Sequence, residues 1–291
     1  MLISLIVCTR NRCASLRTCL EYIERLESPG DWELVIVDNG STDGTPDLLK
    51  SFSESARFPV VVVQESKSGL GRARNAGIAR ARGEILAFTD DDCYVSPDYL
   101  IRILDVFKDE KIGYMGGRVL LFDKTDVPQT IRTETDIRLV EPYSFIRAGQ
   151  LLGANMALRK SLIAEIGAFD PEFGAGSRFS SGEDVDLQAR ASASGATGIY
   201  HPGPLVWHHH GRKPGKRYDE LMKGYEYGLG AYYAKFILNP QTRLLFLKTW
   251  YWEVRGKIRD KESSSMLREL AGAFRYILTG AFRYILMRLH R

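Results

Sequence analysis

Several features that define other protein classes are missing from this chain of 291 residues. It has only four cysteines and no Cys-x-x-Cys pair, which argues against a disulfide-stapled secreted domain and favours reduced thiols in a cytoplasmic protein. No uninterrupted apolar run reaches the roughly 18 residues that a transmembrane helix requires. The chain begins with MLISLIVCT, without a basic segment or a cleavage site, so we expect a strand there and not a signal peptide.

Charge is distributed unevenly along the chain. Residues 1–210 hold 23 Lys and Arg against 29 Asp and Glu, whereas residues 211–291 hold 17 against 7. The overall net charge of +4 therefore hides a strongly basic C-terminal part, which is also rich in aromatic residues. Length and composition predict one large domain over residues 1–215 and a helical, basic and aromatic tail over residues 216–291.

The first hundred residues alternate between strand-like and helix-like segments. Apolar runs of strand length occupy residues 2–9, 33–37, 60–64 and 84–89. Helical spacing or helix start signals lie between them, including an N-cap at Thr45 followed by Pro46. This order predicts an α/β fold with a parallel, right-handed doubly wound sheet, whose ligands bind outside the carboxyl ends of the strands.

Polar residues follow three of these strands, where such a sheet binds its ligands. They are Thr9, Arg10, Asn11 and Arg12 after the first strand, Asp38 after the second, and Asp90, Asp91 and Asp92 after the fourth. Three adjacent carboxylates repel one another unless a cation neutralises them, and hard oxygen ligands suit Mg²⁺ or Mn²⁺. The structural alternatives are a turn at Asp38, in Asp-Asn-Gly-Ser, and a solvated acidic turn at residues 90–92.

Three further segments carry chemistry-bearing side chains. Arg74 lies in GLGRARNAG, whose glycine pattern is a weak signal because it does not close the first βα turn. Glu183 and Asp184 lie at the predicted first turn of a helix, where the helix dipole favours anions, and acids are common there for structural reasons alone. Trp207 precedes three histidines, which cannot all face one site in an extended chain because neighbours alternate sides.

Six blocks in this order resemble the family 2 glycosyltransferases with the GT-A fold: VCTRNR, VDNGSTDGT, GLGRARNAGI, ARGEILAFTDDD, GANMALRKSLIAEIGAFDPEF and GEDVDLQARA. The resemblance covers about residues 1–210. It implies a nucleotide-diphosphosugar-binding, Rossmann-like α/β domain that uses Mn²⁺ or Mg²⁺. It also implies inverting transfer from a UDP- or dTDP-type nucleotide-sugar donor to a saccharide or lipid-linked saccharide acceptor, in the synthesis of cell-surface polysaccharides or glycans.

On the donor side, the resemblance assigns roles residue by residue. Asp38 and the segment from Thr9 to Arg12 match the base- and ribose-binding positions, with the Asp38 carboxylate accepting from the base ring. Asp90, Asp91 and Asp92 match the Asp-x-Asp motif, in which Asp92 ligates the metal and Asp90 contacts the metal or ribose. Arg74 is the arginine we expect to meet diphosphate charge.

On the acceptor side, Glu183 and Asp184 match the family's Glu-Asp motif. The resemblance makes Asp184 the general base that takes the acceptor hydroxyl proton, with Asp186 as the nearest competitor. His208 matches a position beside the metal or the diphosphate, and a surface role is its alternative. The Gln-x-x-Arg-Trp motif of processive members is absent, so we expect transfer of one or a few sugars.

The tail contains a short repeat, GAFRYIL, at residues 272–278 and 280–286. On a helical projection its apolar residues fall on one arc: Leu270, Phe274, Ile277, Leu278, Ala281, Phe282, Ile285 and Leu289. Such a helix is expected to lie in a membrane interface and use its arginines on anionic lipid, as a peripheral protein at the inner face of the plasma membrane would. The alternative is a terminal helix that packs on the catalytic domain or on a second subunit of a homo-oligomer.

Two other functions are compatible with parts of the sequence. A nucleotidyltransferase would share metal and diphosphate recognition, but it would leave the Glu-Asp block without a role and would need a lysine-bearing glycine loop near the start. A non-catalytic sugar- or nucleic-acid-binding protein would use the basic tail, and its nucleic-acid affinity would fall steeply with salt. We expect an enzyme with no nucleic-acid partner.

Overall fold

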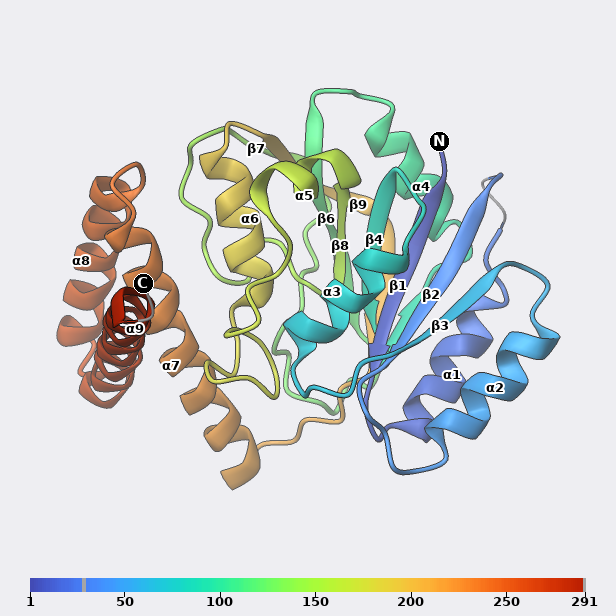
Figure 1. Ribbon diagram of the computed structural model, residues 1–291, viewed down its shortest axis with the longest axis horizontal. Helices are drawn as coiled ribbons and strands as arrows, with labels where there is room; N and C mark the ends of the chain where they lie inside the picture. Colours follow the sequence, from blue (N-terminus) through green and yellow to red (C-terminus); the bar gives the residue numbers. More distant parts are fainter. Residues whose placement is uncertain (28–29, 290–291) are drawn as a thin grey trace.

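The computed structural model describes residues 1–27 and 30–289, with side chains described as far as residue 280. A mixed β-sheet forms the centre, helices cover both of its faces, and three C-terminal helices lie at one end (Figure 1). The strands are β1 Ile3–Thr9, β2 Trp32–Asp38, β3 Val60–Gln64, β4 Ile85–Asp90, β5 Cys93–Val95, β6 Ile112–Leu121, β7 Arg138–Val140, β8 Asn155–Arg159 and β9 Thr197–His208. The helices are α1 Cys13–Ile23, α2 Thr45–Ser55, α3 Leu70–Arg80, α4 Tyr99–Phe107, α5 Lys160–Ile166, α6 Glu183–Ala193, α7 Lys216–Leu238, α8 Arg243–Arg259 and α9 Ser263–Leu289.

The described strands are ordered β3-β2-β1-β4-β8-β6-β9-β5, and β7 pairs with β9. The first four strands in this order, β3, β2, β1 and β4, are parallel to one another, as the alternation of strands and helices predicts. The prediction of a parallel sheet is wrong beyond β4, because β8 runs antiparallel to both β4 and β6. Between β6 and β8 the chain has no crossover helix, which a parallel return would need, so it re-enters the sheet in the opposite direction.

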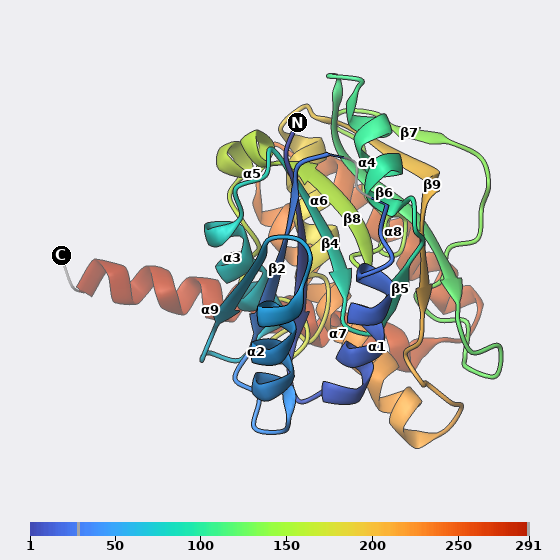
Figure 2. The same cartoon turned by 90° about the vertical axis from the view of Figure 1, so that its right-hand side faces the viewer.

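Alternation along β1 divides the core between the two faces of the sheet. Ile3, Leu5 and Val7 pack with α1, α2 and α4, whereas Ile6 packs on the opposite face with α5, α6 and α7. Figure 2 shows α1 and α2 in front of the sheet. Both clusters are built from buried apolar side chains, so the sheet is a rigid base for the polar residues at the ends of its strands.

The carboxyl ends of three strands meet at one edge of this sheet. Thr9 pairs with Asp38 across β1 and β2, and Cys8 pairs with Asp90 across β1 and β4. The register therefore confirms that the polar residues after these strands converge. One local prediction is wrong: Gly44 is the N-cap of α2, and Thr45 is already helical, with its backbone N–H donating to Asp43 Oδ1 at 3.0 Å.

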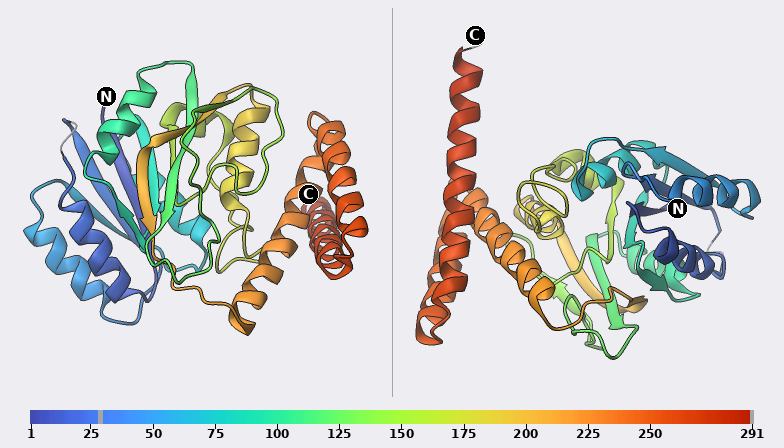
Figure 3. Two further views of the ribbon diagram at one scale, coloured as in Figure 1. Left: turned by 180° about the vertical axis from the view of Figure 1, so that it is seen from behind. Right: turned by 90° about the horizontal axis from the view of Figure 1, so that it is seen from below.

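The three C-terminal helices continue the hydrophobic cluster on the α6 side of the sheet. Aromatic rings join α7 to α8, with Tyr233 stacked on Trp250 at 5.3 Å and Phe236 stacked on Phe246 at 4.6 Å. The backbones of α7 and α9 approach so closely that a Cβ atom at Gly272 would clash with the carbonyl oxygen of Tyr227. Part of α9 extends beyond the rest of the molecule (Figure 3). The division at residues 215 and 216 falls between β9 and α7 and stays a prediction.

No helix in the described part of the chain is both long and apolar enough to cross a membrane.

Candidate active site

A cavity of about 970 Å³ lies at the carboxyl edge of the sheet. Most of the predicted site residues line it, although they are far apart in the sequence: Thr9, Arg10, Arg12, Arg74, Asp90, Asp91, Asp92, Glu183, Asp184 and His208. The fold thus brings the acidic run, the Glu-Asp pair and the first histidine to one site. Asn11 and Asp38 are not part of the described lining.

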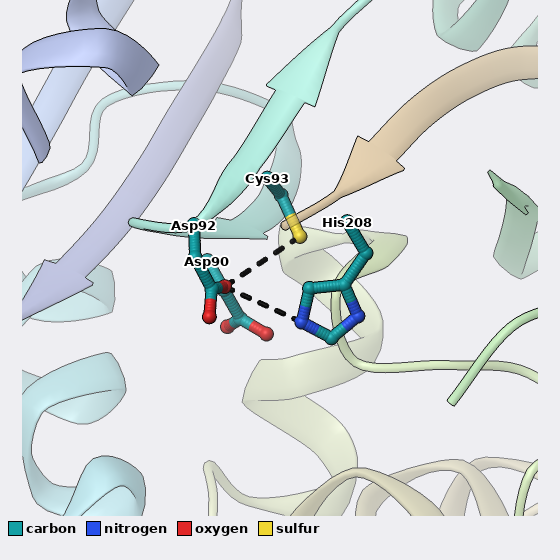
Figure 4. Close-up of side chains that lie close together, drawn as sticks. All are labelled: Asp90, Asp92, Cys93 and His208. Atoms are coloured by element: carbon teal, nitrogen blue, oxygen red, sulfur yellow. Dashed lines mark hydrogen bonds and ion pairs between the residues drawn. The ribbon is translucent and has the colours of Figure 1, made fainter. Parts of the chain in front are cut away.

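Four side chains at one end of the cavity form a compact group of metal-ligating types (Figure 4). Asp90, Asp92, Cys93 and His208 each offer one ligand atom, and these atoms lie within 4.8 Å of one another. Antiparallel pairing of β5 with β9 causes this proximity, because it sets His208 directly opposite Cys93. His208 Nε2 lies 3.4 Å from Asp92 Oδ1.

The chemistry of this group fits a hard divalent cation held by oxygen and nitrogen. Burial raises the pKa of the Cys93 thiol well above its usual value, and a soft sulfur ligand suits Mn²⁺ or Mg²⁺ less well than oxygen and imidazole nitrogen do. The His208 ring is oriented from behind by Thr130, whose Oγ1 donates to the Gln129 carbonyl and lies 3.4 Å from His208 Nδ1. Without a cation, a proton on Nε2 would face Asp92. With a cation bound, the proton would lie on Nδ1, and the Nε2 lone pair would join Asp90 and Asp92 as a ligand of Mn²⁺ or Mg²⁺.

The acidic run is partly neutralised by the protein itself. Arg12 contacts Asp91 at 3.2 Å and Asp92 at 2.7 Å, and Thr9 Oγ1 donates to Asp91 at 2.7 Å. Burial raises the pKa of Asp91 to about 7, although Arg12 opposes the rise. Burial also favours the protonated form of Asp92, but His208 and Arg12 outweigh it and hold the pKa of Asp92 well below its usual range. Asp92 is therefore charged at neutral pH.

Arg74 connects the two acidic motifs. Its guanidinium is buried and lies 3.1 Å from Asp90 Oδ1 and 3.1 Å from Glu183 Oε1. It also donates to the carbonyl of Gly153 at 3.4 Å. Burial and the neighbouring Asp184 raise the pKa of Glu183 to about 7 even with Arg74 beside it. Arg74 thus fixes the spacing between the acidic run and the Glu-Asp pair.

Asp184 is the more accessible acid of its pair, at the first turn of α6. Its Oδ2 accepts from the backbone N–H of Gly153 at 2.8 Å, and its Oδ1 accepts from that of Val185 at 2.8 Å. These two bonds fix the direction of the carboxylate in the cavity wall. Asp186 instead is fully buried, with carboxylate oxygens 3.0 Å from Arg190 and 2.6 Å from Lys235, and it is not among the described lining residues.

Sequence comparison places this chain in a known family. The glycosyl transferase family 2 model matches residues 4–167, more than half of the chain. The chain belongs to glycosyltransferase family 2. Glycosyltransferase AglE of Haloferax volcanii is 25% identical over 222 residues, which cover 76% of this chain and 69% of AglE. EpsH of Bacillus subtilis is 39% identical over 108 residues, 37% of this chain and 31% of EpsH.

Solved structures confirm the GT-A fold of this glycosyltransferase. The mannosyltransferase PcManGT of Pyrobaculum calidifontis, solved in complex with GDP-Man and Mn²⁺, superposes with a TM-score of 0.64 at 19% identity. The match covers 97% of this chain and 80% of PcManGT, so the likeness includes the C-terminal helices. The predicted α/β class, the GT-A domain and the helical extension are thereby confirmed, as is the prediction of an enzyme.

Two predicted donor-binding residues of the glycosyltransferase lie beside the cavity. Asp38 is buried at the end of β2, where its Oδ1 accepts from the Ser41 backbone N–H at 2.8 Å, as the turn alternative predicts. Asn11 has a positive φ of 54° and its Oδ1 accepts from the Thr42 backbone N–H at 2.7 Å. Both side chains hold the loops at this edge together, and their contacts to the donor stay predictions.

The three histidines divide as an extended chain requires. The rings of His208 and His210 lie 4.8 Å apart on one side of the chain. His209 points to the other side, where Tyr94 Oη lies 3.0 Å from its Nδ1. The alternation is confirmed, and only His208 joins the group around Asp92.

Sequence reasoning missed several residues of this glycosyltransferase site. Cys93 directly follows the acidic run, so its position could have been noticed. Gly153 begins the block GANMALRKSLIAEIGAFDPEF, but the resemblance assigns it no role. Thr130 lies in a stretch, residues 122–151, that shows no recognisable pattern, and no local signal marks it. The same holds for Leu221, Met222, Tyr225 and Leu229, which line the cavity from α7.

Proposed function

We propose that this glycosyltransferase transfers a sugar from a UDP- or dTDP-type nucleotide sugar to a hydroxyl of a saccharide or lipid-linked saccharide, with inversion at the anomeric carbon. One observation carries the proposal. Asp184 and the group of Asp90, Asp92 and His208 line the same cavity, and Arg74 holds the two motifs in fixed relation. A base and a diphosphate site on opposite sides of one sugar are what a single in-line displacement needs.

Asp90, Asp92 and His208 are the residues that would hold the divalent cation. When bound, Mn²⁺ or Mg²⁺ supplies positive charge for the diphosphate leaving group. Five carboxyl groups at the site, at residues 90–92, 183 and 184, face two engaged guanidinium groups, Arg12 and Arg74, so negative charge exceeds positive charge even with Asp91 and Glu183, whose pKa is about 7, partly protonated. This excess of negative charge supports a cation. Arg10 is exposed at the rim of the same cavity, where it can pair with phosphate.

Asp184 performs the acceptor chemistry in this proposal. Each of its oxygens accepts one backbone N–H, which orients the carboxylate and leaves a further lone pair on each oxygen. One of these takes the proton from the acceptor hydroxyl as that oxygen attacks C1 of the donor sugar and the bond to the diphosphate breaks. Attack opposite the leaving group inverts the configuration.

The acceptor enters from the side of α7. The cavity extends from Asp184 past Leu221, Met222, Tyr225 and Leu229, which give it an apolar wall. An acceptor that presents both a hydroxyl and an apolar portion matches this combination, and this supports a lipid-linked saccharide. Such a reaction belongs to the synthesis of cell-surface polysaccharides or glycans.

The donor is tested with UDP-, dTDP- and GDP-sugars, each with Mn²⁺, with Mg²⁺ and with chelator. A ligand that binds only the folded protein raises its melting temperature according to RT ln(1 + [L]/Kd). We expect metal-dependent stabilisation by a UDP- or dTDP-sugar. Equal stabilisation with and without chelator, or by GDP-sugars alone, would contradict the proposed donor and metal use.

Asp184→Asn tests the mechanism. Loss of a general base costs about 10²–10⁴ in rate, so we expect kcat to fall by this factor while the donor Kd stays nearly unchanged. In the variant, the amide NH₂ faces one of the two backbone N–H donors that the carboxylate accepted, and this can destabilise the fold. The melting temperature is therefore measured in parallel. Asp136→Asn, at an exposed acid outside the cavity, is the control. Retention of more than about a tenth of wild-type kcat would assign the base to another residue.

A further inference from the structure

The outer surface of the C-terminal helices carries most of the exposed large apolar side chains of the protein. Of sixteen such side chains among the described residues, eleven lie between residues 238 and 278. On α8, Leu244, Ile258 and Trp252 are the most exposed, at 80%, 60% and 58%, and Tyr251 is 56% exposed. On α9, Leu267 and Phe274 are 61% and 63% exposed. Scattered apolar residues are normal on a surface, but a concentration on two helices marks an interaction site.

These side chains form stripes because the opposite sides of both helices are already packed. On α8, Phe246 and Trp250 face α7, which leaves Leu244 and Tyr251, seven residues apart, on the outside. On α9, Gly272 and the buried Ala273 face α7. The predicted apolar arc therefore remains exposed at Leu270, Phe274, Ile277 and Leu278, while the helix also packs on its own domain. The side chains of the arc from Ala281 onward lie outside the described part of the chain.

Charge is sorted between the inner and outer sides of these helices. Three acids of the tail are engaged inside: Glu226 with Arg268, Glu269 with Lys257, and Glu253 with the hydroxyl of Tyr233. The exposed basic residues are Arg243, Lys248, Arg255, Arg259, Lys261 and Arg275, and between Arg243 and Gly280 the exposed acids are Asp260 and Glu262. The outer surface is therefore apolar, aromatic and positively charged.

We propose that the outer surface of α8 and α9 binds peripherally to an anionic lipid bilayer. Leucine and aromatic side chains enter the interface between headgroups and acyl chains, while lysine and arginine beside them pair with anionic headgroups. Arg255 lies 5.7 Å from the ring centre of Tyr251 and 5.2 Å from that of Trp252, so apolar and cationic groups are interleaved. A second copy of the chain fits less well, because it would bring two positively charged surfaces together.

The position of this surface relates it to the cavity. Lys257, Glu262 and Ser265, at the junction of α8 and α9, line the cavity that holds Asp184. The neighbouring Ile258 and Leu267 are exposed on the outside. A bilayer bound to the outer surface would lie next to the α7 side of the cavity. Binding to lipid itself does not depend on the proposed glycosyl transfer.

The test is flotation of the full chain with vesicles of phosphatidylcholine alone or mixed in equal parts with phosphatidylglycerol. We expect binding to the mixed vesicles that weakens as salt is raised, and little binding to phosphatidylcholine alone. Each basic residue near an anionic surface contributes about fivefold in affinity, so Lys248→Glu with Arg255→Glu should weaken binding by more than about tenfold. Leu267→Ser with Phe274→Ser should weaken it as well, because the apolar contact is lost.

Matched controls lie on the catalytic domain. Arg17→Glu with Lys50→Glu reverses two exposed charges on α1 and α2, at the opposite end of the molecule from α8 and α9 (Figure 1). Ile137→Ser with Leu139→Ser removes two exposed apolar side chains at 57% and 58% exposure. Both controls should bind vesicles like the wild type. The proposal would be overturned if the wild type did not bind anionic vesicles, or if the controls lost as much binding as the tail variants. It would also be overturned if the protein bound no vesicles but sedimented as a dimer that the tail substitutions dissociate.

Discussion

Arg74 gives the most direct test of how the site is held together. Arg74→Met keeps most of the apolar length of the side chain but removes the guanidinium between Asp90 and Glu183. Removing one partner of a buried ion pair costs about 3–5 kcal/mol when the other charge has no alternative partner. Here the cost is reduced, because 30% of the Asp90 side chain is exposed to water and Glu183, with a pKa of about 7, readily takes up a proton. We expect a loss of about 2–3 kcal/mol of unfolding free energy near neutral to mildly basic pH.

The pH dependence of this loss has a definite sign. Without the guanidinium the pKa of Glu183 rises further above its value in the unfolded chain. The folded protein then binds a proton that the unfolded chain has released, so stability is retained at low pH and lost as pH rises through the folded-state pKa. Arg74→Met should therefore cost more at about pH 8 than at about pH 6. Adding Glu183→Gln should recover part of the stability at the higher pH, because the uncompensated charge is gone.

Thermal and urea denaturation at the two pH values measure these changes. For a chain of this size, a loss of about 2–3 kcal/mol corresponds to a fall of about 4–10 °C in melting temperature. Arg80→Met, at an exposed arginine of the same helix, is the control and should leave the melting temperature nearly unchanged. A fall of less than about 2 °C for Arg74→Met, or a loss that is independent of pH, would refute the bridging role.

Three other substitutions test the donor side. Asp92→Asn should abolish metal-dependent thermal stabilisation by the nucleotide sugar and leave the fold intact by circular dichroism; stabilisation that persists would exclude Asp92 as a metal ligand. Thr130→Val should lower Mn²⁺ affinity about 10–100-fold in calorimetric titration, with recovery in Thr130→Ser, because the ring of His208 loses its orienting oxygen; an unchanged affinity would contradict this. Asp38 should favour UDP over CDP by about 1–3 kcal/mol, since cytosine lacks the ring N–H that the carboxylate would accept, and Asp38→Asn should remove the difference; equal affinities in the wild type would argue against base recognition.

Local sequence patterns are enough to predict the helices and strands of about the first third of the chain and most of the candidate site residues. Up to about residue 107, the strands and helices can be predicted because their apolar residues recur at strand or helix spacing in the sequence. Because parallel strands end at a common edge, the strand pattern alone is enough to place Thr9, Asp38 and Asp90 together. The resemblance to family 2 also supplied Asp184, which lies in the sixth block, and His208, which follows that block. For the tail, the sequence predicted an apolar arc but left its environment open.

The contacts between these residues could not be predicted from the sequence, because they form between segments that meet only on folding. The partners of Arg74 are 16 and 109 residues away, and no local pattern encodes such contacts. The antiparallel strand β8, the Thr130 contact to His208 and the apolar wall from α7 likewise depend on segments that meet only after folding. The same is true of α9, where close backbone approach at Gly272 settles which side packs on α7 and leaves the opposite, apolar side at the surface.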